Sequence, residues 1–170
     1  MYQRILVPLD GSDASRRALE QAIAVARLTG GALRLVHVID ELAHLTGFET
    51  ARTYFQEVLP GLCRRGRKLL EDARIQAASA GVATEADLAE CHAARVADIL
   101  LQEAERWKAD LIVMGTRGRR GAQRLLLGSD AEQVLRCASV PVLLVRSAAA
   151  SPQAAAAEAS AATASRINAP

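Results

Sequence analysis

The chain has 170 residues, 51% of them hydrophobic, which is enough for one sizeable core and too little for two. Its formal net charge of +2 is too small to indicate a nucleic-acid-binding domain, because such domains are usually strongly basic. No apolar run approaches the ~20 residues of a membrane span, and no signal-peptide core follows Met1. We therefore expect one soluble, cytoplasmic domain without membrane contact.

Five apolar segments alternate with segments of helical period, which is typical of βα units and a parallel sheet. The strands are expected near residues 4–9, 32–39, 82–89, 110–115 and 140–146. Four are apolar nearly throughout, as strands covered on both faces should be. The third contains Thr84, Glu85 and Asp87 and is expected toward an edge. The predicted fold is α/β and Rossmann-like, a five-stranded parallel sheet flanked by helices on both faces.

The helices differ in how clearly the sequence defines them. The first is expected over about 13–29, with Ser12 as its N-cap and Gly30 as its stop. Residues 40–60 have helical content but end at Pro60 and Gly61, so we interpret them as a variable, partly helical excursion. The later helices are expected over about 61–80, along a stripe of Val96, Ile99, Leu100, Ala104 and Trp107, and from Ser129 to about Ala138.

Residues 147–170 differ in composition from the rest of the chain. They are half alanine with serine and two prolines, and Ile167 is their one large aliphatic residue. Such a segment cannot bury enough apolar surface to fold alone. We expect a folded domain over 1–146 followed by a disordered, alanine-rich tail.

The three cysteines, Cys63, Cys91 and Cys137, form no C-x-x-C pair. An odd number without such a pair favours reduced thiols in a reducing compartment over a disulfide framework or a zinc site. We therefore expect no cysteine chemistry and no metal held by protein ligands alone.

The segment that follows the fourth strand, "MGTRGRRGAQRLLLGSD" at 114–130, contains four glycines and four arginines. In an open parallel sheet, ligands bind beyond the carboxyl ends of the strands, and this loop begins there. Gly128 and Ser129 stand at the start of the last expected helix, where unpaired N–H groups and the helix dipole favour an anion. The loop therefore indicates a phosphate-binding site without identifying the phosphate compound.

The spacing Gly115-x(2)-Gly118-x(9)-Gly128-Ser129 resembles the nucleotide-binding signature of the ATP-binding branch of the universal stress protein family. The segments "ILVPLDGSDAS", "LVHVID" and "GSDAEQVLRCASVPVLLVR" resemble the same family, so the resemblance covers about 1–146. It implies a sheet of the adenine nucleotide alpha hydrolase-like type. It also implies that ATP or another adenine nucleotide binds at the strand ends.

By motif position, the resemblance implies eleven site residues. Pro8, Leu9, Asp10 and the Val38 backbone would contact the adenosine; Met114, Gly115, Arg117 and Gly118 the ribose and phosphates; and Gly128, Ser129 and Asp130 the phosphate tail. Asp130 departs from the family pattern, which often has an uncharged residue there. Arg117 and its neighbours would offset that charge, and a bound Mg²⁺ would make Asp130 an outer-sphere partner, because hard cations favour carboxylate oxygen.

Several of these residues also fit roles without a ligand. Asp10 and Gly11 fit an ordinary turn with a helix-capping acid equally well. Two glycines at the spacing of Gly115 and Gly118, without the rest of the motif, are typical of turns. The loop arginines other than Arg117 fit a solvated basic face. His37, in an apolar strand, is expected to be a hydrogen-bonded core histidine.

Three other function classes were weighed against nucleotide binding. A P-loop phosphotransferase needs G-x(4)-G-K-[ST], which the loop lacks. A nucleic-acid-binding protein could use the basic loop on phosphates, but 3% aromatic residues argue against base stacking. An α/β enzyme acting on an adenylated substrate needs a base that the sequence does not show.

The sequence therefore predicts an adenine-nucleotide-binding stress protein that acts as a regulatory or partner-binding module, with at most slow ATP hydrolysis. The apolar strand at 141–145 predicts an antiparallel homodimer, which the family resemblance also implies, because an exposed edge strand invites pairing with another chain.

Overall fold

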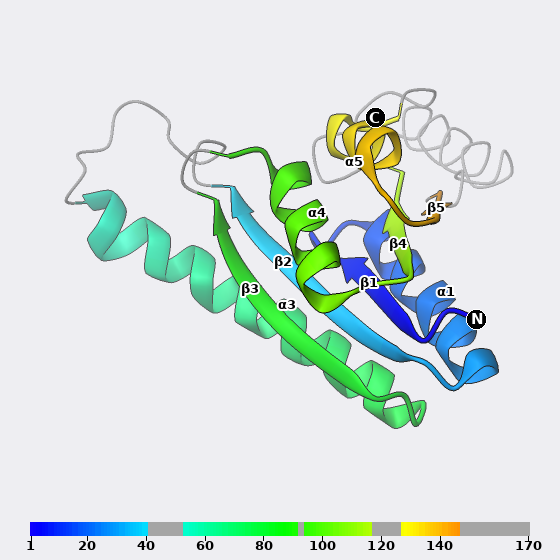
Figure 1. Cartoon of the computed structure of the whole chain (residues 1–170). Coiled ribbons are helices and arrows are strands. Elements are labelled where there is room, and N and C mark those ends of the chain that lie inside the picture. The colour runs from blue at the N-terminus through cyan, green and yellow to red at the C-terminus, as the bar shows by residue number, and fades with distance from the viewer. Residues whose placement is uncertain (41–52, 92–93, 117–126, 147–170) are drawn as a thin grey trace, which may run out of the picture.

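The computed structural model describes residues 1–40, 53–91, 94–116 and 127–146. Within these residues, the strands are β1 (Arg4–Pro8), β2 (Ala32–Asp40), β3 (Thr84–Cys91), β4 (Leu111–Gly115) and β5 (Val142–Val145). They form one parallel sheet in the order β3-β2-β1-β4-β5 (Figure 1). The predicted five-stranded parallel sheet is confirmed, and β3 lies at an edge as expected.

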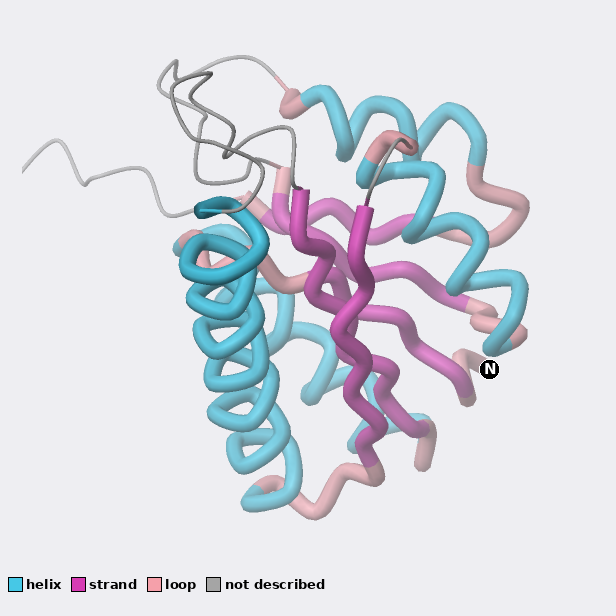
Figure 2. The backbone as a smooth tube through the Cα atoms, turned by 90° about the vertical axis from the view of Figure 1, so that its left-hand side faces the viewer, coloured by secondary structure: helices cyan, strands magenta, loops and turns pink. Residues whose placement is uncertain are grey.

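Helices cover both faces of this sheet. They are α1 (Asp13–Thr29), the π-helical turn η1 (Tyr54–Val58), α3 (Leu59–Ser79), α4 (Val96–Trp107) and α5 (Ser129–Cys137). Buried residues of α1 and α3 share one core cluster with the sheet, and those of α4 and α5 share a second on its other face. Figure 2 shows the strands between these two helical layers.

The central strands alternate between the two cores. In β1, Ile5 and Val7 join the cluster under α1 and α3, whereas Leu6 joins the cluster under α4, and all three are fully buried. In β4, Val113 joins the cluster under α1 and α3, and Ile112 joins the cluster under α4. This two-sided burial explains why these strands are apolar nearly throughout.

The ends of α1 follow the capping residues predicted from the sequence. The Ser12 hydroxyl accepts a hydrogen bond from the Ser15 backbone N–H at 3.2 Å. At the other end, Gly30 has a φ of 68° and donates its N–H to the Ala26 carbonyl. Glycine adopts this left-handed backbone conformation at little energetic cost because it lacks a Cβ, and it therefore ends helices well.

The expected break at Pro60 and Gly61 is wrong. Helical structure runs from η1 directly into α3, which begins at Leu59 and continues through both residues. Pro60 lies in the first turn of α3, but η1 precedes it without a break, so its missing N–H leaves one helical hydrogen bond unmade at the junction. Residues 41–52 and 147–170 lie outside the described residues, so the predicted excursion is described only in part.

The buried face of α4 differs from the predicted stripe. Leu100, Ala104 and Trp107 are buried as expected, but Val96 and Ile99 are only half-buried. Ala97 and Glu103 are buried as well. The helix is therefore turned slightly from the expected orientation, and it places a carboxylate against the sheet.

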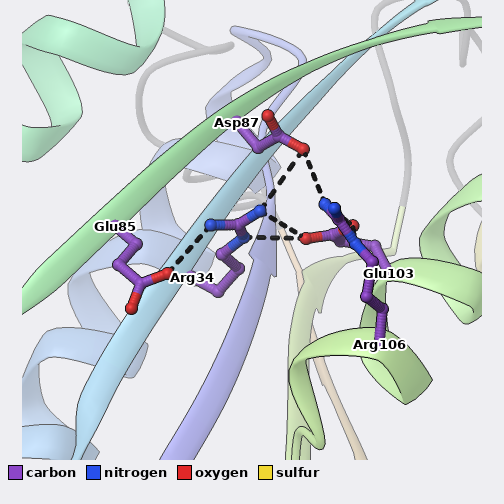
Figure 3. Close-up of polar contacts among 5 residues, drawn as sticks. All are labelled: Arg34, Glu85, Asp87, Glu103 and Arg106. Carbon is purple, nitrogen blue, oxygen red and sulfur yellow. Dashed lines mark hydrogen bonds and ion pairs between the residues drawn. The ribbon is translucent and has the colours of Figure 1, made fainter.

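Glu103 is buried because two arginines hold its carboxylate (Figure 3). Arg34 Nε and Nη2 lie 2.8 and 2.7 Å from Glu103 Oε1, and Arg106 Nε and Nη2 lie 2.9 and 2.6 Å from Oε2. The hydrogen bond to Glu103 raises the pKa of Arg106 above its ordinary value. Arg34 also contacts Glu85 at 2.9 Å and Asp87 at 3.4 Å on the edge strand β3.

No helix among the described residues is long and apolar enough to cross a membrane. In the same part of the chain, Cys63 and Cys91 are buried, Cys137 is exposed, and none of the three forms a disulfide.

Candidate functional site

A cavity of about 560 Å³ lies beyond the carboxyl ends of β1, β2 and β4. From β1, the sheet continues to β2 on one side and to β4 on the other. The chain leaves the end of β1 toward β2 and the end of β4 toward β5, so these two connections diverge and open a crevice at the strand ends. This switch point is where open α/β sheets bind their ligands.

The structure places nine of the eleven predicted site residues around this one cavity. They are Pro8, Leu9, Asp10, Val38, Met114, Gly115, Gly128, Ser129 and Asp130. The other two, Arg117 and Gly118, lie outside the described residues. Segments separated by more than a hundred residues in the sequence thus meet at one place.

The turn between β1 and α1 holds the Asp10 carboxylate at the cavity. Asp10 Oδ1 accepts hydrogen bonds from the Ser12 backbone N–H at 3.0 Å and from the Ser12 hydroxyl at 2.6 Å. Gly11 has a φ of 82°, which lets the chain turn at once into the helix. Asp10 therefore forms the turn expected as its alternative role and also lines the cavity.

The link between β4 and α5 closes the opposite side of the cavity. The Thr116 N–H donates to the Val145 carbonyl at 2.8 Å, and the Gly128 N–H donates to the Thr116 carbonyl at 2.9 Å. These bonds fix the start of α5 beside the end of β4. The first backbone N–H groups of a helix have no partner within it, so this end of α5 offers donors and positive potential to an anion.

The two described glycines of this link have different structural roles. Gly128 has φ −67° and ψ 149°, a conformation open to any residue, so its backbone does not require glycine. At Gly115, a Cβ would lie 2.8 Å from Ala14 Cβ. Gly115 is therefore required for close packing of β4 against α1, as well as lining the cavity.

A third wall, formed by α3, was not predicted from the sequence. Leu62, Arg65, Gly66 and Leu69 line the cavity at the spacing of one helix face. At Gly66, a Cβ would lie 2.6 Å from Leu88 Cδ1 and 2.7 Å from His37 Cδ2, so only glycine lets α3 approach β2 this closely. The helical period of these residues was visible in the sequence, but no ligand motif marked them.

His37 is buried and bonded, as expected of a core histidine. Its Nδ1 lies 2.6 Å from the Leu9 carbonyl oxygen, which accepts the hydrogen bond, so Nδ1 carries the proton in this contact. His37 also borders the cavity. Through Leu9 it joins β2 to the turn that presents Asp10.

The charges around the cavity are unevenly distributed. Among its described lining residues, Asp10, Asp40 and Asp130 carry carboxylates, and Arg65 carries the one guanidinium. No group of three or more His, Cys, Asp or Glu residues in the described part of the chain is arranged to hold a metal ion. The arrangement suits a ligand with anionic groups that face α5 and α3 and polar hydroxyls that face Asp10.

Comparisons with known proteins agree with this architecture. The model of the universal stress protein family matches residues 1–146. A universal stress protein of Thermus aquaticus is 38% identical over 146 residues, which cover 86% of this chain and 100% of that protein. The solved structure of the hypothetical protein MJ0577 has a TM-score of 0.76 at 26% identity, covering 88% of this chain and 99% of that one.

A second solved structure contains a ligand. It is a universal stress protein in complex with cAMP, with a TM-score of 0.63 at 27% identity, covering 86% of this chain and 98% of that one.

Sheet order, helix layers and a cavity at the switch point define an α/β protein of the kind that binds ligands at its strand ends. This chain belongs to the universal stress protein family, which confirms the motif resemblance at the level of the family.

Proposed function

We propose that this chain is a universal stress protein of the ATP-binding branch, and that the cavity at the strand ends binds ATP or another adenine nucleotide. The observation that carries the proposal is that nine of the motif residues line one cavity of about 560 Å³. That volume is typical of sites for small ligands and cofactors. The complex of a related universal stress protein with cAMP supports an adenine ligand.

The two ends of the cavity match the two ends of a nucleotide. Val36, Val38, Val96 and Leu100 form an apolar wall between β2 and α4 that suits an adenine ring. The N-terminus of α5, at Gly128 and Ser129, suits the phosphates. Asp10 also lines the cavity, and its carboxylate would accept hydrogen bonds from ribose hydroxyls.

Mg²⁺ would act together with the nucleotide rather than bind alone. It is usually held by one or two carboxylates together with substrate phosphates and water. Asp130 supplies one carboxylate at the cavity, in the first turn of α5. The residues present therefore fit a magnesium ion that is bound through the phosphates.

The protein would act as a homodimer and as a regulatory module for a further protein partner. β5 pairs with β4 along one side, and within the described residues its other side has no strand beside it. Leu143 of this strand is 39% exposed. An apolar edge of this kind favours antiparallel pairing with a second copy through residues 141–145.

Calorimetry with ATP, ADP and AMP, preceded by mass spectrometry of any ligand retained on purification, tests the nucleotide site. We expect saturable binding with one nucleotide per chain. Gly128→Val should weaken ATP binding by at least about tenfold, because the φ of Gly128 permits valine while the branched side chain occupies the anion position. Ser139→Val, at an exposed position after α5, is the matched control and should bind normally.

Two results would contradict the proposal. One is the absence of saturable binding for all three nucleotides. The other is oligonucleotide binding that falls steeply with salt, which is the behaviour of a nucleic-acid-binding protein.

A further inference from the structure

Arg65 belongs to the α3 wall and not to the nucleotide motif. It lies three residues after Leu62 and four before Leu69, so all three are on one face of α3 and line the cavity. Gly66 seats this face against His37 and Leu88 without space for a Cβ. α3 is therefore held close to the sheet, and Arg65 is its one charged residue in the cavity lining.

The Arg65 guanidinium is available for a ligand. None of the ion pairs and side-chain hydrogen bonds within the described residues involves it, although three aspartates share the cavity lining. By contrast, Arg34, Arg74, Arg106 and Arg136 each pair with a carboxylate. Arginine binds phosphate through two parallel hydrogen bonds, which makes it a selective phosphate ligand.

Arg65 and the start of α5 lie on different sides of the cavity. α3 packs on β2 and β3, whereas α5 packs on α4 and β5 on the opposite face of the sheet (Figures 1 and 2). Leu69, one turn after Arg65, lies against the Asp10 turn, since a Cβ on Gly11 would be 3.9 Å from both Leu69 Cδ atoms. Arg65 is therefore on the ribose side of the proposed site, away from the donors that face the 5′-phosphates.

We propose that Arg65 is a specificity-determining residue that binds a phosphate group on the ribose, so the preferred ligand is an adenine nucleotide with a 2′- or 3′-phosphate besides its 5′-phosphate. This inference rests on the proposed adenine-nucleotide site. A ribose phosphate is the group that an arginine near a bound ribose accommodates in dinucleotide-binding folds. Asp10 would then contact the ribose hydroxyl that stays free.

Titration calorimetry in metal-free buffer tests the preference with ligands of matched charge. Adenosine 3′,5′-bisphosphate and adenosine 2′,5′-bisphosphate are compared with AMP and with ADP, which carries both phosphates on the 5′ side. We expect one bisphosphate isomer to bind at least about fivefold more tightly than AMP and more tightly than ADP, as a charged hydrogen-bonded pair allows. The isomer with the higher affinity identifies whether Arg65 binds the phosphate at the 2′ or at the 3′ position of the ribose.

Arg65→Gln should bring the affinity for that bisphosphate to within about twofold of the same variant's affinity for AMP. Arg64→Gln is the matched control, because Arg64 is exposed like Arg65 but does not line the cavity. Thermal melting of both variants checks that they are folded. A bisphosphate preference that survives Arg65→Gln, or is lost equally in Arg64→Gln, would overturn the inference.

The two proposals fail in different ways. If the wild-type protein binds AMP and ADP but shows no preference for either bisphosphate, the role of Arg65 is wrong and the nucleotide site stands. If no adenine nucleotide binds, both proposals are wrong.

Discussion

Gly115, the last residue of β4, lies against Ala14 in the first turn of α1, so closely that a Cβ on Gly115 would be 2.8 Å from Ala14 Cβ and 2.9 Å from the Ala14 carbonyl carbon. This contact joins two of the segments that border the cavity. It also means that one glycine of the nucleotide motif is needed by the fold before any ligand binds. Gly115 therefore serves both the packing of β4 on α1 and the lining of the cavity.

Gly115→Ala should lower the free energy of unfolding by about 1–3 kcal/mol, because the added methyl group meets backbone atoms that cannot move away independently. Urea denaturation measures the change. Gly128→Ser is the control at the other end of the same link: its φ of −67° suits serine, which is a good N-cap residue. Equal stabilities for the two variants would show that β4 and α1 do not need this close contact.

The Glu103 cluster makes a second prediction about stability. Glu103→Leu should destabilise the fold by about 2–4 kcal/mol, because it leaves Arg34, whose side chain is 14% exposed, with fewer compensating charges. Glu85→Gln should cost less than about 1 kcal/mol, because the Glu85 side chain is 61% exposed and its ion pair is screened by water.

Arg34→Met combined with Glu103→Leu provides the stricter test of this cluster. Replacing a buried ion pair by apolar side chains of similar size is often close to neutral. We therefore expect the double variant to recover most of the stability lost in Glu103→Leu, as measured by urea denaturation. A double variant less stable than Glu103→Leu would show that the charges position α4 for another reason.

The strands were predicted well because the apolar residues within each strand indicate by themselves that the strand is buried. Expected and observed strand ends differ by at most two residues, and Ser12 and Gly30 bounded α1 correctly. Glu103 was missed because its main partner, Arg34, is 69 residues away in the chain. A charged residue on a helix is predicted to be exposed to solvent unless an oppositely charged partner elsewhere in the chain is known.

The same limit applies to the site. The motif residues were found because their spacing is local and resembles a known family, and nine of them line the cavity. Arg65 and Gly66 were missed because only the packing of α3 on the sheet brings them there. Helical periodicity shows that such residues share a face, but it does not show which strand end that face meets.

The dimer prediction depends on the edge strand β5. Leu143→Lys should shift the protein from dimer to monomer at micromolar concentration, because a charged lysine on an edge strand opposes strand pairing. Light scattering measures the mass. Leu28→Lys is the control, since Leu28 is 88% exposed and belongs to α1 rather than to the edge strand. A wild-type protein that is already monomeric at this concentration would rule out the dimer.

Asp130 allows a test of how metal and nucleotide act together. Its carboxylate lies in the first turn of α5, where it competes with a phosphate for the same N–H groups and repels the phosphate charge. We therefore expect Asp130→Val to bind ATP about threefold to tenfold more tightly than the wild type in EDTA. With Mg²⁺ present, the variant should gain less affinity than the wild type, since the ion has lost a carboxylate partner.

Calorimetry of each variant in EDTA and then in Mg²⁺ measures this coupling. Glu132→Gln is the matched control, because Glu132 lies in the same helical turn but pairs with Arg136 at 2.7 Å and does not line the cavity. It should change ATP binding by less than about twofold, since an exposed charge away from the ligand is screened by salt. If Asp130→Val weakens ATP binding in EDTA, the carboxylate does not oppose the phosphates, and α5 does not receive them at its first turn.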